Sequence, residues 1–250
     1  RGVEPLAVYR AASVSAARIF GLTDRGLVAP GKRADLVVLD SLESCRARMV
    51  FSAGREVTDE LFASRREVAP VGRNSARASK VAADDFTVRA GNDEAHVIGV
   101  VPGRIITEHL RHALPVSDGQ FQVDLDADII KVAVVERHGK NGNIATGFVK
   151  GFGLKSGAIA STVGHDSHNI CCVGTDETDM AVAVNRLGEI EGGFVVAEGG
   201  KVVAELPLPV AGLISLESYE GVRDRLVDLR KAAFALGATL EEPFLQIAFL

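Results

Sequence analysis

The 250-residue sequence contains no tryptophan, and aromatic residues make up only 5% of it. Proteins that bind single-stranded nucleic acid stack bases on aromatic side chains, so no such partner is expected. Three cysteines, Cys45, Cys171 and Cys172, are too few and too unevenly spaced for a disulfide framework, which predicts a reducing, cytoplasmic compartment. No apolar run approaches 18 residues, so no membrane-spanning helix is expected.

Familiar catalytic signatures are missing as well. The sequence has no Gly-x-Ser-x-Gly nucleophile elbow and no His-x-Glu paired with Pro-Cys-x-x-Cys, the pattern of cytidine-type zinc deaminases. The glycines at 151–157 do not have phosphate-loop spacing, because only one residue separates Gly151 from Gly153. The sequence therefore holds no complete catalytic set that can be recognised from spacing alone.

Both ends of the sequence are unusual. The chain begins at Arg1 with neither a starting methionine nor a signal-peptide pattern, and it ends on the apolar run 244–250. We expect both ends to be cut from a longer chain. The final run is then predicted to be an interrupted core element, cut within or beside the last strands.

Charge is divided unevenly along the chain. Residues 1–80 carry 14 Lys and Arg against 9 Asp and Glu, whereas residues 81–250 carry 14 against 24. Such asymmetry predicts two modules. A Pro- and Gly-containing stretch with few structure signals, 63–81, is the predicted linker.

Hydrophobic periodicity predicts an α+β fold. In the first module the patterns indicate a helix at 4–20, strands at 26–29 and 34–39, and a hairpin at 46–57. The second module is predicted to contain helices at 176–190 and 216–236 and strands at 96–101, 104–107, 129–136, 144–152, 158–163 and 169–173, with a hairpin at 193–206.

Polar residues capable of acid–base chemistry cluster at His165-Asp166-Ser167-His168-Asn169, between two apolar strand-like runs. Two histidines at i and i+3 could move protons or, with a backbone bend and the thiolates of Cys171 and Cys172, bind a metal. The alternative is a polar loop that satisfies its own backbone. Arg137-His138, at the end of a predicted strand, could hold an anion or a carbonyl group, or form a solvated turn. His109 and His112 are interpreted as surface residues.

Two stretches resemble a known enzyme family. Gly31-Lys32-Arg33-Ala34-Asp35-Leu36-Val37-Val38-Leu39-Asp40 resembles the segment that leads from the barrel into a small β-sandwich in the amidohydrolase superfamily. The runs 145–161, 164–169 and 206–213, together with Arg137-His138, are similar to the C-terminal domain of bacterial adenine deaminases.

The resemblance implies a domain plan and an activity. Residues 1–22 would be the last helix of a truncated TIM-type barrel, 23–62 part of the associated β-sandwich, 63–81 a linker, and 82–250 an α+β adenine deaminase C-terminal domain truncated at its end. The enzyme would hydrolyse adenine to hypoxanthine and ammonia with water activated by manganese or iron. The principal metal ligands would lie before residue 1, so no metal ligand is assigned here.

Supporting or lid roles are implied for six residues: Arg137, His138, His165, Asp166, His168 and Asn169. The expected partners are adenine, the missing N-terminal barrel and further copies in a homo-oligomer, with no nucleic acid and no membrane. The 250 residues alone are expected to be inactive. Two alternatives stay open: the tail of another amidohydrolase acting on a cyclic amide or purine, and a non-catalytic binding or assembly domain.

Overall fold

A computed structural model describes residues 2–64, 66, 68–91 and 93–250. The chain divides into two compact units, an N-terminal unit up to Ala69 and a C-terminal unit from Pro70 to Leu250. The predicted domain boundaries at 22, 62 and 81 stay predictions. Positions 65 and 67 of the predicted linker, position 1 of the predicted barrel segment and position 92 of the predicted C-terminal domain lie outside the described residues.

The N-terminal unit begins with a helical segment, as predicted for 4–20. It consists of α1 (Pro5–Arg10), a π-helical stretch (Ala11–Ser15) and α2 (Ala16–Ile19). Glu4 caps it by accepting a hydrogen bond from the Ala7 N–H at 2.9 Å, and Pro5 occupies the first turn, where no N–H is needed.

A small antiparallel sheet and a short helix complete the described part of this unit. The strands are β1 (Leu36–Leu39), β2 (Ala47–Ser52) and β3 (Arg55–Glu56), and the helix is α3 (Asp59–Ala63). The predicted hairpin at 46–57 is confirmed by the β2–β3 pairing. That this sheet is part of a β-sandwich stays a prediction.

The predicted strand at 26–29 is wrong. Gly26 has φ +91°, outside the region that strands use, and its backbone lies against the helix. A Cβ at this position would come within 2.6 Å of the Ala17 Cβ. Leu27 and Val28 are exposed, so the apolar run does not indicate a buried strand here.

The C-terminal unit is built on one large mixed sheet. Among the described residues this sheet has eight strands, in the order β13-β12-β10-β11-β8-β9-β4-β5. The bounds are β4 (Ala95–Val100), β5 (Thr107–His112), β8 (Ile129–Val135), β9 (Ile144–Lys150), β10 (Ala158–Ser161), β11 (Ile170–Gly174), β12 (Gly193–Glu198) and β13 (Lys201–Pro207). Neighbouring strands run antiparallel except β4 and β9, which pair in parallel through Val97–Gly99 and Phe148–Lys150. The α+β class is therefore confirmed for this unit.

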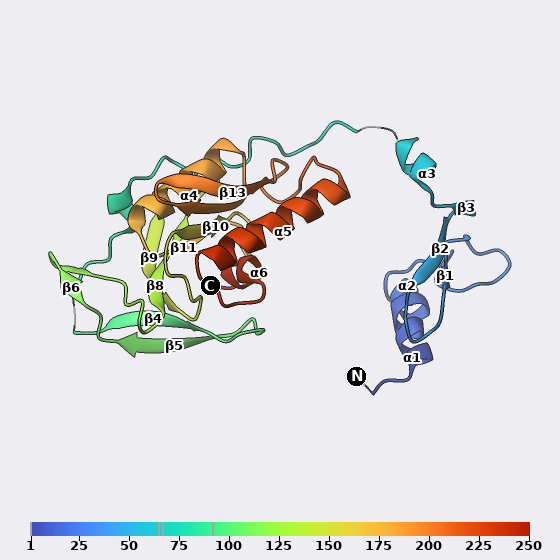
Figure 1. The fold of residues 1–250 in the computed structure, drawn as a ribbon. Helices are drawn as coiled ribbons and strands as arrows, with labels where there is room; N and C mark the ends of the chain where they lie inside the picture. Colours follow the sequence, from blue (N-terminus) through green and yellow to red (C-terminus); the bar gives the residue numbers. More distant parts are fainter. Residues whose placement is uncertain (1, 65, 67, 92) are drawn as a thin grey trace. The chain divides into compact units, whose positions relative to one another are not determined.

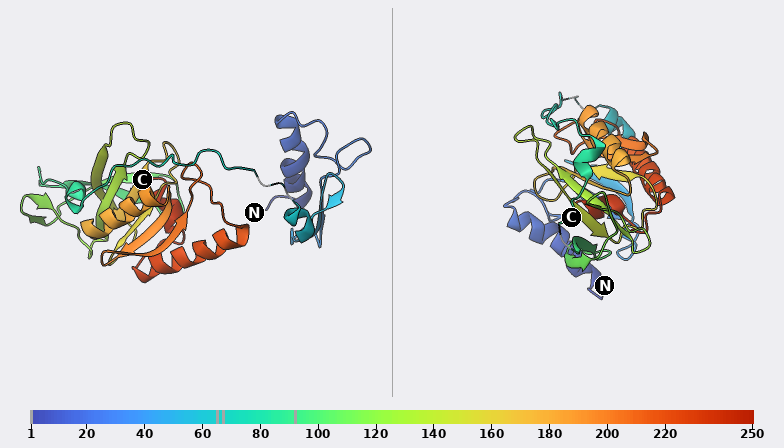
Figure 2. Two further views of the ribbon diagram at one scale, coloured as in Figure 1. Left: turned by 90° about the horizontal axis from the view of Figure 1, so that it is seen from above. Right: turned by 90° about the vertical axis from the view of Figure 1, so that its left-hand side faces the viewer.

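Helices cover both faces of this sheet (Figures 1 and 2). Alternate residues of β8 explain why: Ile130 and Val132 pack with α5 (Tyr219–Ala235) and α6 (Pro243–Ile247), whereas Ala133 and Val135 pack with α4 (Glu177–Glu189). The core consequently lies in two layers, one on each side of the sheet.

Short elements close the open parts of the α4 side. The 3₁₀ turn η2 (Ala83–Phe86) inserts Phe86 beside α4, and the small hairpin of β6 (Val116–Ser117) and β7 (Gln120–Phe121) places Phe121 over Phe148. Phe121 and Phe148 meet edge to face, with ring centroids 6.3 Å apart.

One further expectation is corrected, and another is made more specific. The predicted hairpin after residue 96 exists, but its second strand is 107–112 rather than 104–107, because a longer turn precedes it. The final run 244–250 is part of the core, as predicted: Pro243 starts helix α6, whose Phe244 and Ile247 are buried against the sheet. None of the helices among the described residues is both long and apolar enough to cross a bilayer.

Candidate functional site

The predicted polar cluster lies in the loop 162–169, which connects β10 to β11 at one end of these two interior strands. The antiparallel register pairs Ile170 with Val135, so the residues preceding β11 lie beside the residues that follow β8. The structure therefore brings Arg137 and His138 together with the loop, although about thirty residues separate the two segments.

Arg137 is the central contact of this region. Its side chain is almost fully buried, at 2% exposure. The Nε atom donates to the His168 carbonyl, Nη2 donates to the Ala211 carbonyl at 3.0 Å, and the backbone N–H donates to Asn169 Oδ1 at 3.4 Å. One guanidinium thereby fixes two separate loops.

Arg137 also carries an uncompensated charge. Within the described part of the chain no carboxylate forms an ion pair with it, and Nη1 has no hydrogen-bond partner. Burial lowers the pKa of the guanidinium, because desolvation disfavours its charged form. An arginine nevertheless stays protonated in proteins, so two carbonyl dipoles must stabilise the charge.

The two loop histidines are held in opposite tautomers. His165 Nδ1 lies 3.1 Å from the Ala248 carbonyl, which can only accept, so Nδ1 carries a proton. His168 Nδ1 accepts a hydrogen bond from the Gly164 N–H at 3.2 Å. In their neutral forms, His165 therefore has Nε2 as an acceptor and His168 has Nε2–H as a donor.

Further contacts hold the loop in place. The His165 ring stacks on Phe249, with centroids 5.2 Å apart. Asp166 accepts hydrogen bonds from the Ser167 backbone N–H and hydroxyl, and these lower the pKa of the Asp166 carboxyl. The Asn169 amide donates to Ser167 Oγ at 3.2 Å. His165 and Asp166 remain exposed, so the loop presents a carboxylate and an imidazole to solvent.

His138 and Glu136 also hold this region in place, through the loop 164–169 and the turn that follows β8. His138 Nε2 donates to the Ser167 carbonyl at 2.8 Å. Glu136 accepts hydrogen bonds from the backbone N–H groups of residues 138, 140, 141 and 142. Desolvation alone would raise the pKa of the Glu136 carboxyl, but the four N–H groups together outweigh it and lower the pKa.

One residue that stabilises this region, Thr162, is not evident from the sequence pattern. Thr162 is fully buried; its hydroxyl donates to the Gly212 carbonyl at 2.6 Å and accepts from the Gly193 N–H at 2.8 Å. Thr162 thereby ties the loop 207–214 to the end of β10. Its position inside an apolar run, Ala158 to Val163, gave no sign of this role.

The described residues of this region gather no set of metal ligands. No group of three or more His, Cys, Asp or Glu side chains in the described residues is arranged to hold a metal ion. Cys171 and Cys172 lie inside β11, and burial raises the pKa of the Cys171 thiol to about 11. The idea that these cysteines supply thiolate ligands is therefore not supported by their surroundings.

Comparison with known proteins identifies the family. The model of the adenine deaminase C-terminal domain matches residues 104–250, and the amidohydrolase family model matches residues 1–65.

The chain belongs to the adenine deaminase C-terminal domain family.

Individual relatives agree with this. The chain is 72% identical over 248 residues to adenine deaminase 1 of Rhizobium johnstonii, 70% identical over 249 residues to adenine deaminase 1 of Rhizobium etli, and 65% identical over 249 residues to the adenine deaminase of Brucella abortus. These alignments cover 99–100% of this chain but only 43–44% of the relatives. The chain thus spans less than half the length of the curated relatives.

Proposed function

We propose that this chain is the C-terminal part of an adenine deaminase, which hydrolyses adenine to hypoxanthine and ammonia. The carrying observation is an identity of 65–72%, sustained over the whole chain, to proteins that bear this name. The order of the two matching families, amidohydrolase at 1–65 and the adenine deaminase domain at 104–250, supports the same conclusion.

In this proposal the metal ion is held by residues outside this chain. A manganese or iron ion needs several His or carboxylate ligands, and the described residues gather no such set. The residues present do not fit the metal, and none of them is assigned to it. We accordingly propose that water is activated in the portion that the longer relatives have and this chain does not span.

Three exposed apolar side chains of the N-terminal unit support this division. Ile19, Phe20 and Val28 are 80%, 77% and 81% exposed, which is unusual for large apolar side chains near one another in sequence. Exposed apolar surface of this kind marks a place where another protein surface packs. We assign the surface that would pack on these side chains to the barrel portion, in agreement with the amidohydrolase match over the same residues.

The loop 164–169 is proposed to close over the purine. Adenine presents an acceptor, N7, beside a donor, the N6 amino group. The donor Nε2–H of His168 and the acceptor Nε2 of His165 complement these two groups. Arg137 and His138 are then positioning residues that hold the loop through the carbonyls of His168 and Ser167.

The family-level proposal is tested by adenine turnover. The protein extended to its natural N-terminus and loaded with manganese or iron is expected to release ammonia from adenine, whereas the 250-residue chain is expected to release none. No turnover by the extended, metal-loaded protein, or turnover by the 250 residues alone, contradicts the proposal.

The loop's role is tested in the same extended protein. His165→Ala and His168→Ala are each expected to lower kcat/KM by about tenfold, the value of one hydrogen bond to substrate. His112→Ala, on strand β5, serves as the matched control and is expected to leave kcat/KM unchanged. Wild-type kcat/KM in both loop variants would overturn the lid role while leaving the family assignment intact.

A further inference from the structure

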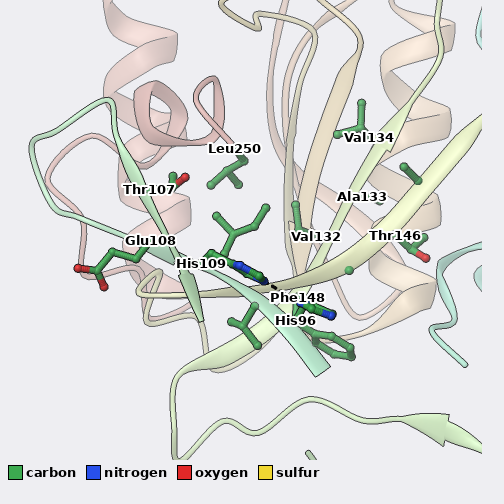
Figure 3. A pocket seen from close by; sticks show the side chains of 14 residues that line it. His96, Thr107, Glu108, His109, Val132, Ala133, Val134, Thr146, Phe148 and Leu250 are labelled. Atoms are coloured by element: carbon green, nitrogen blue, oxygen red, sulfur yellow. Dashed lines mark hydrogen bonds between the residues drawn. The ribbon is translucent and has the colours of Figure 1, made fainter. Parts of the chain in front are cut away.

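A second concave site lies on the α5 side of the sheet. Helices α5 and α6 pack against β10–β13, and beyond them β4, β5, β8 and β9 form the floor of a groove of about 430 Å³. Its walls are mainly aliphatic, as Figure 3 shows, with Ile98, Val132, Val134 and Leu250 among its lining residues. A volume of this size suits a small ligand.

Two histidines line this groove and touch each other. His96 Nδ1 lies 2.7 Å from His109 Nε2, and the ring planes differ by only 14°. Atoms of rings stacked face to face stay about 3.5 Å apart, so a nitrogen–nitrogen contact of 2.7 Å means that these rings meet edge to edge. With centroids 4.9 Å apart, the two imidazoles form one nearly flat surface, which we call the His96–His109 pair.

Strand register explains this arrangement. The β4–β5 hairpin pairs Ile98 with His109 and His96 with Arg111, so His96 and His109 are diagonal neighbours on one face. The N–H···N hydrogen bond between them uses one donor and one acceptor, so it holds both rings in a common plane. Both side chains are exposed to the groove.

The described residues that line the groove contribute one carboxylate side chain and no lysine or arginine. Glu108 is the charged residue among those that line it, and strand alternation turns its side chain to the opposite face from His109. Figure 3 shows its carboxylate directed away from the His96–His109 pair. The Thr107 hydroxyl is a neutral hydrogen-bonding group at the rim.

We propose that this groove is an accessory binding site for a neutral purine base. The His96–His109 pair is a two-ring platform that matches a fused bicyclic base, and the aliphatic walls favour an uncharged, planar ligand. The class of planar heteroaromatic follows from the groove itself; the choice of purine rests on the proposed function. This site is separate from the loop 164–169, whose residues do not line the groove.

The test uses 2-aminopurine as the probe and the 250-residue chain as the protein. Because the chain has no tryptophan, the fluorescence of the probe can be followed with little protein signal. Saturable quenching is expected, and adenine and hypoxanthine are expected to compete for the site. Since this chain is not expected to turn over adenine, binding and deaminase activity are measured independently.

Substitutions test whether 2-aminopurine binds at the His96–His109 pair. His96→Ala and His109→Ala are each expected to weaken 2-aminopurine binding at least tenfold, and His96→Gln and His109→Gln to do the same; thermal unfolding verifies that each variant is folded. His112→Ala, on β5 but on the other face, and His168→Ala, in the loop, are expected to bind as wild type does. Absence of saturable quenching, or equal loss in either control, or wild-type binding without the His96–His109 pair, would overturn the proposal.

Discussion

Gly212 lies so close to Arg137 that a Cβ added to it would come within 2.6 Å of Nη1. Gly212 also has φ +71°, a backbone conformation that side chains disfavour. The loop 207–214 and the buried guanidinium therefore fit together only because position 212 has no side chain.

A glycine-to-alanine comparison isolates this contact. Gly103 has the same φ of +71°, but a Cβ there would meet no atom within 4 Å. Both Gly212→Ala and Gly103→Ala introduce the same backbone strain. The additional loss in the free energy of unfolding at Gly212 therefore comes from the collision with Arg137, and we expect it to be about 1–3 kcal/mol. Urea unfolding of the two variants measures the difference, and equal costs would show that Arg137 moves aside freely.

Removing the Arg137 guanidinium should loosen two loops at once. In Arg137→Met the carbonyls of His168 and Ala211 lose their donor in a buried place, and we expect a loss of about 3 kcal/mol in the free energy of unfolding. Backbone amide exchange should quicken at 164–169. Arg73→Met, which removes an exposed pair with Glu191, is the control and should cost less than about 1 kcal/mol. Equal costs for the two variants would contradict the central role of Arg137.

The Glu136 carboxylate should make stability depend on pH in a defined window. Its pKa is lowered in the folded chain, so its stabilisation is present above the unfolded value of about 4.3 and is lost as the pH falls through the lower folded pKa. Glu136→Gln should therefore lower the melting temperature at pH 7, and its difference from wild type should shrink below about pH 4. Glu241→Gln, at an exposed position, is the control. A difference that persists undiminished in acid would contradict this account.

Cysteine labelling should distinguish the three thiols. Cys45 is exposed, whereas Cys171 and Cys172 are buried in β11, where burial raises the pKa of both thiols. A disulfide reagent at neutral pH should react with about one thiol in the folded chain and with all three after unfolding. Rapid reaction of Cys171 in the folded chain would show that β11 separates readily from its neighbouring strands.

Periodicity identified most of the sheet because each strand buries a regular pattern of residues. The strands at 129–135, 144–150 and 170–174 and both long helices lie where apolar spacing placed them. Periodicity does not predict the structure at 26–29, where the apolar residues are exposed and a close glycine contact decides the path of the backbone. The apolar run 244–250 is a core element, but its composition alone does not show that Pro243 starts a helix there.

The candidate site was found only in part, because its contacts join distant segments. The polar composition of 165–169 identified the loop, but nothing local shows that Arg137 lies beneath it or that Thr162 holds Gly212. The His96–His109 pair was missed for the same reason. Its two members become neighbours only through the register of a hairpin whose turn is longer than the pattern indicated.

The last three residues of the described chain contact both the loop 164–169 and the groove. The Ala248 carbonyl receives His165, Phe249 lies under the same imidazole, and Leu250 lines the groove of the His96–His109 pair. Three consecutive residues therefore supply contacts to both places, so a substitution or cleavage within Ala248–Leu250 would alter the loop and the groove together.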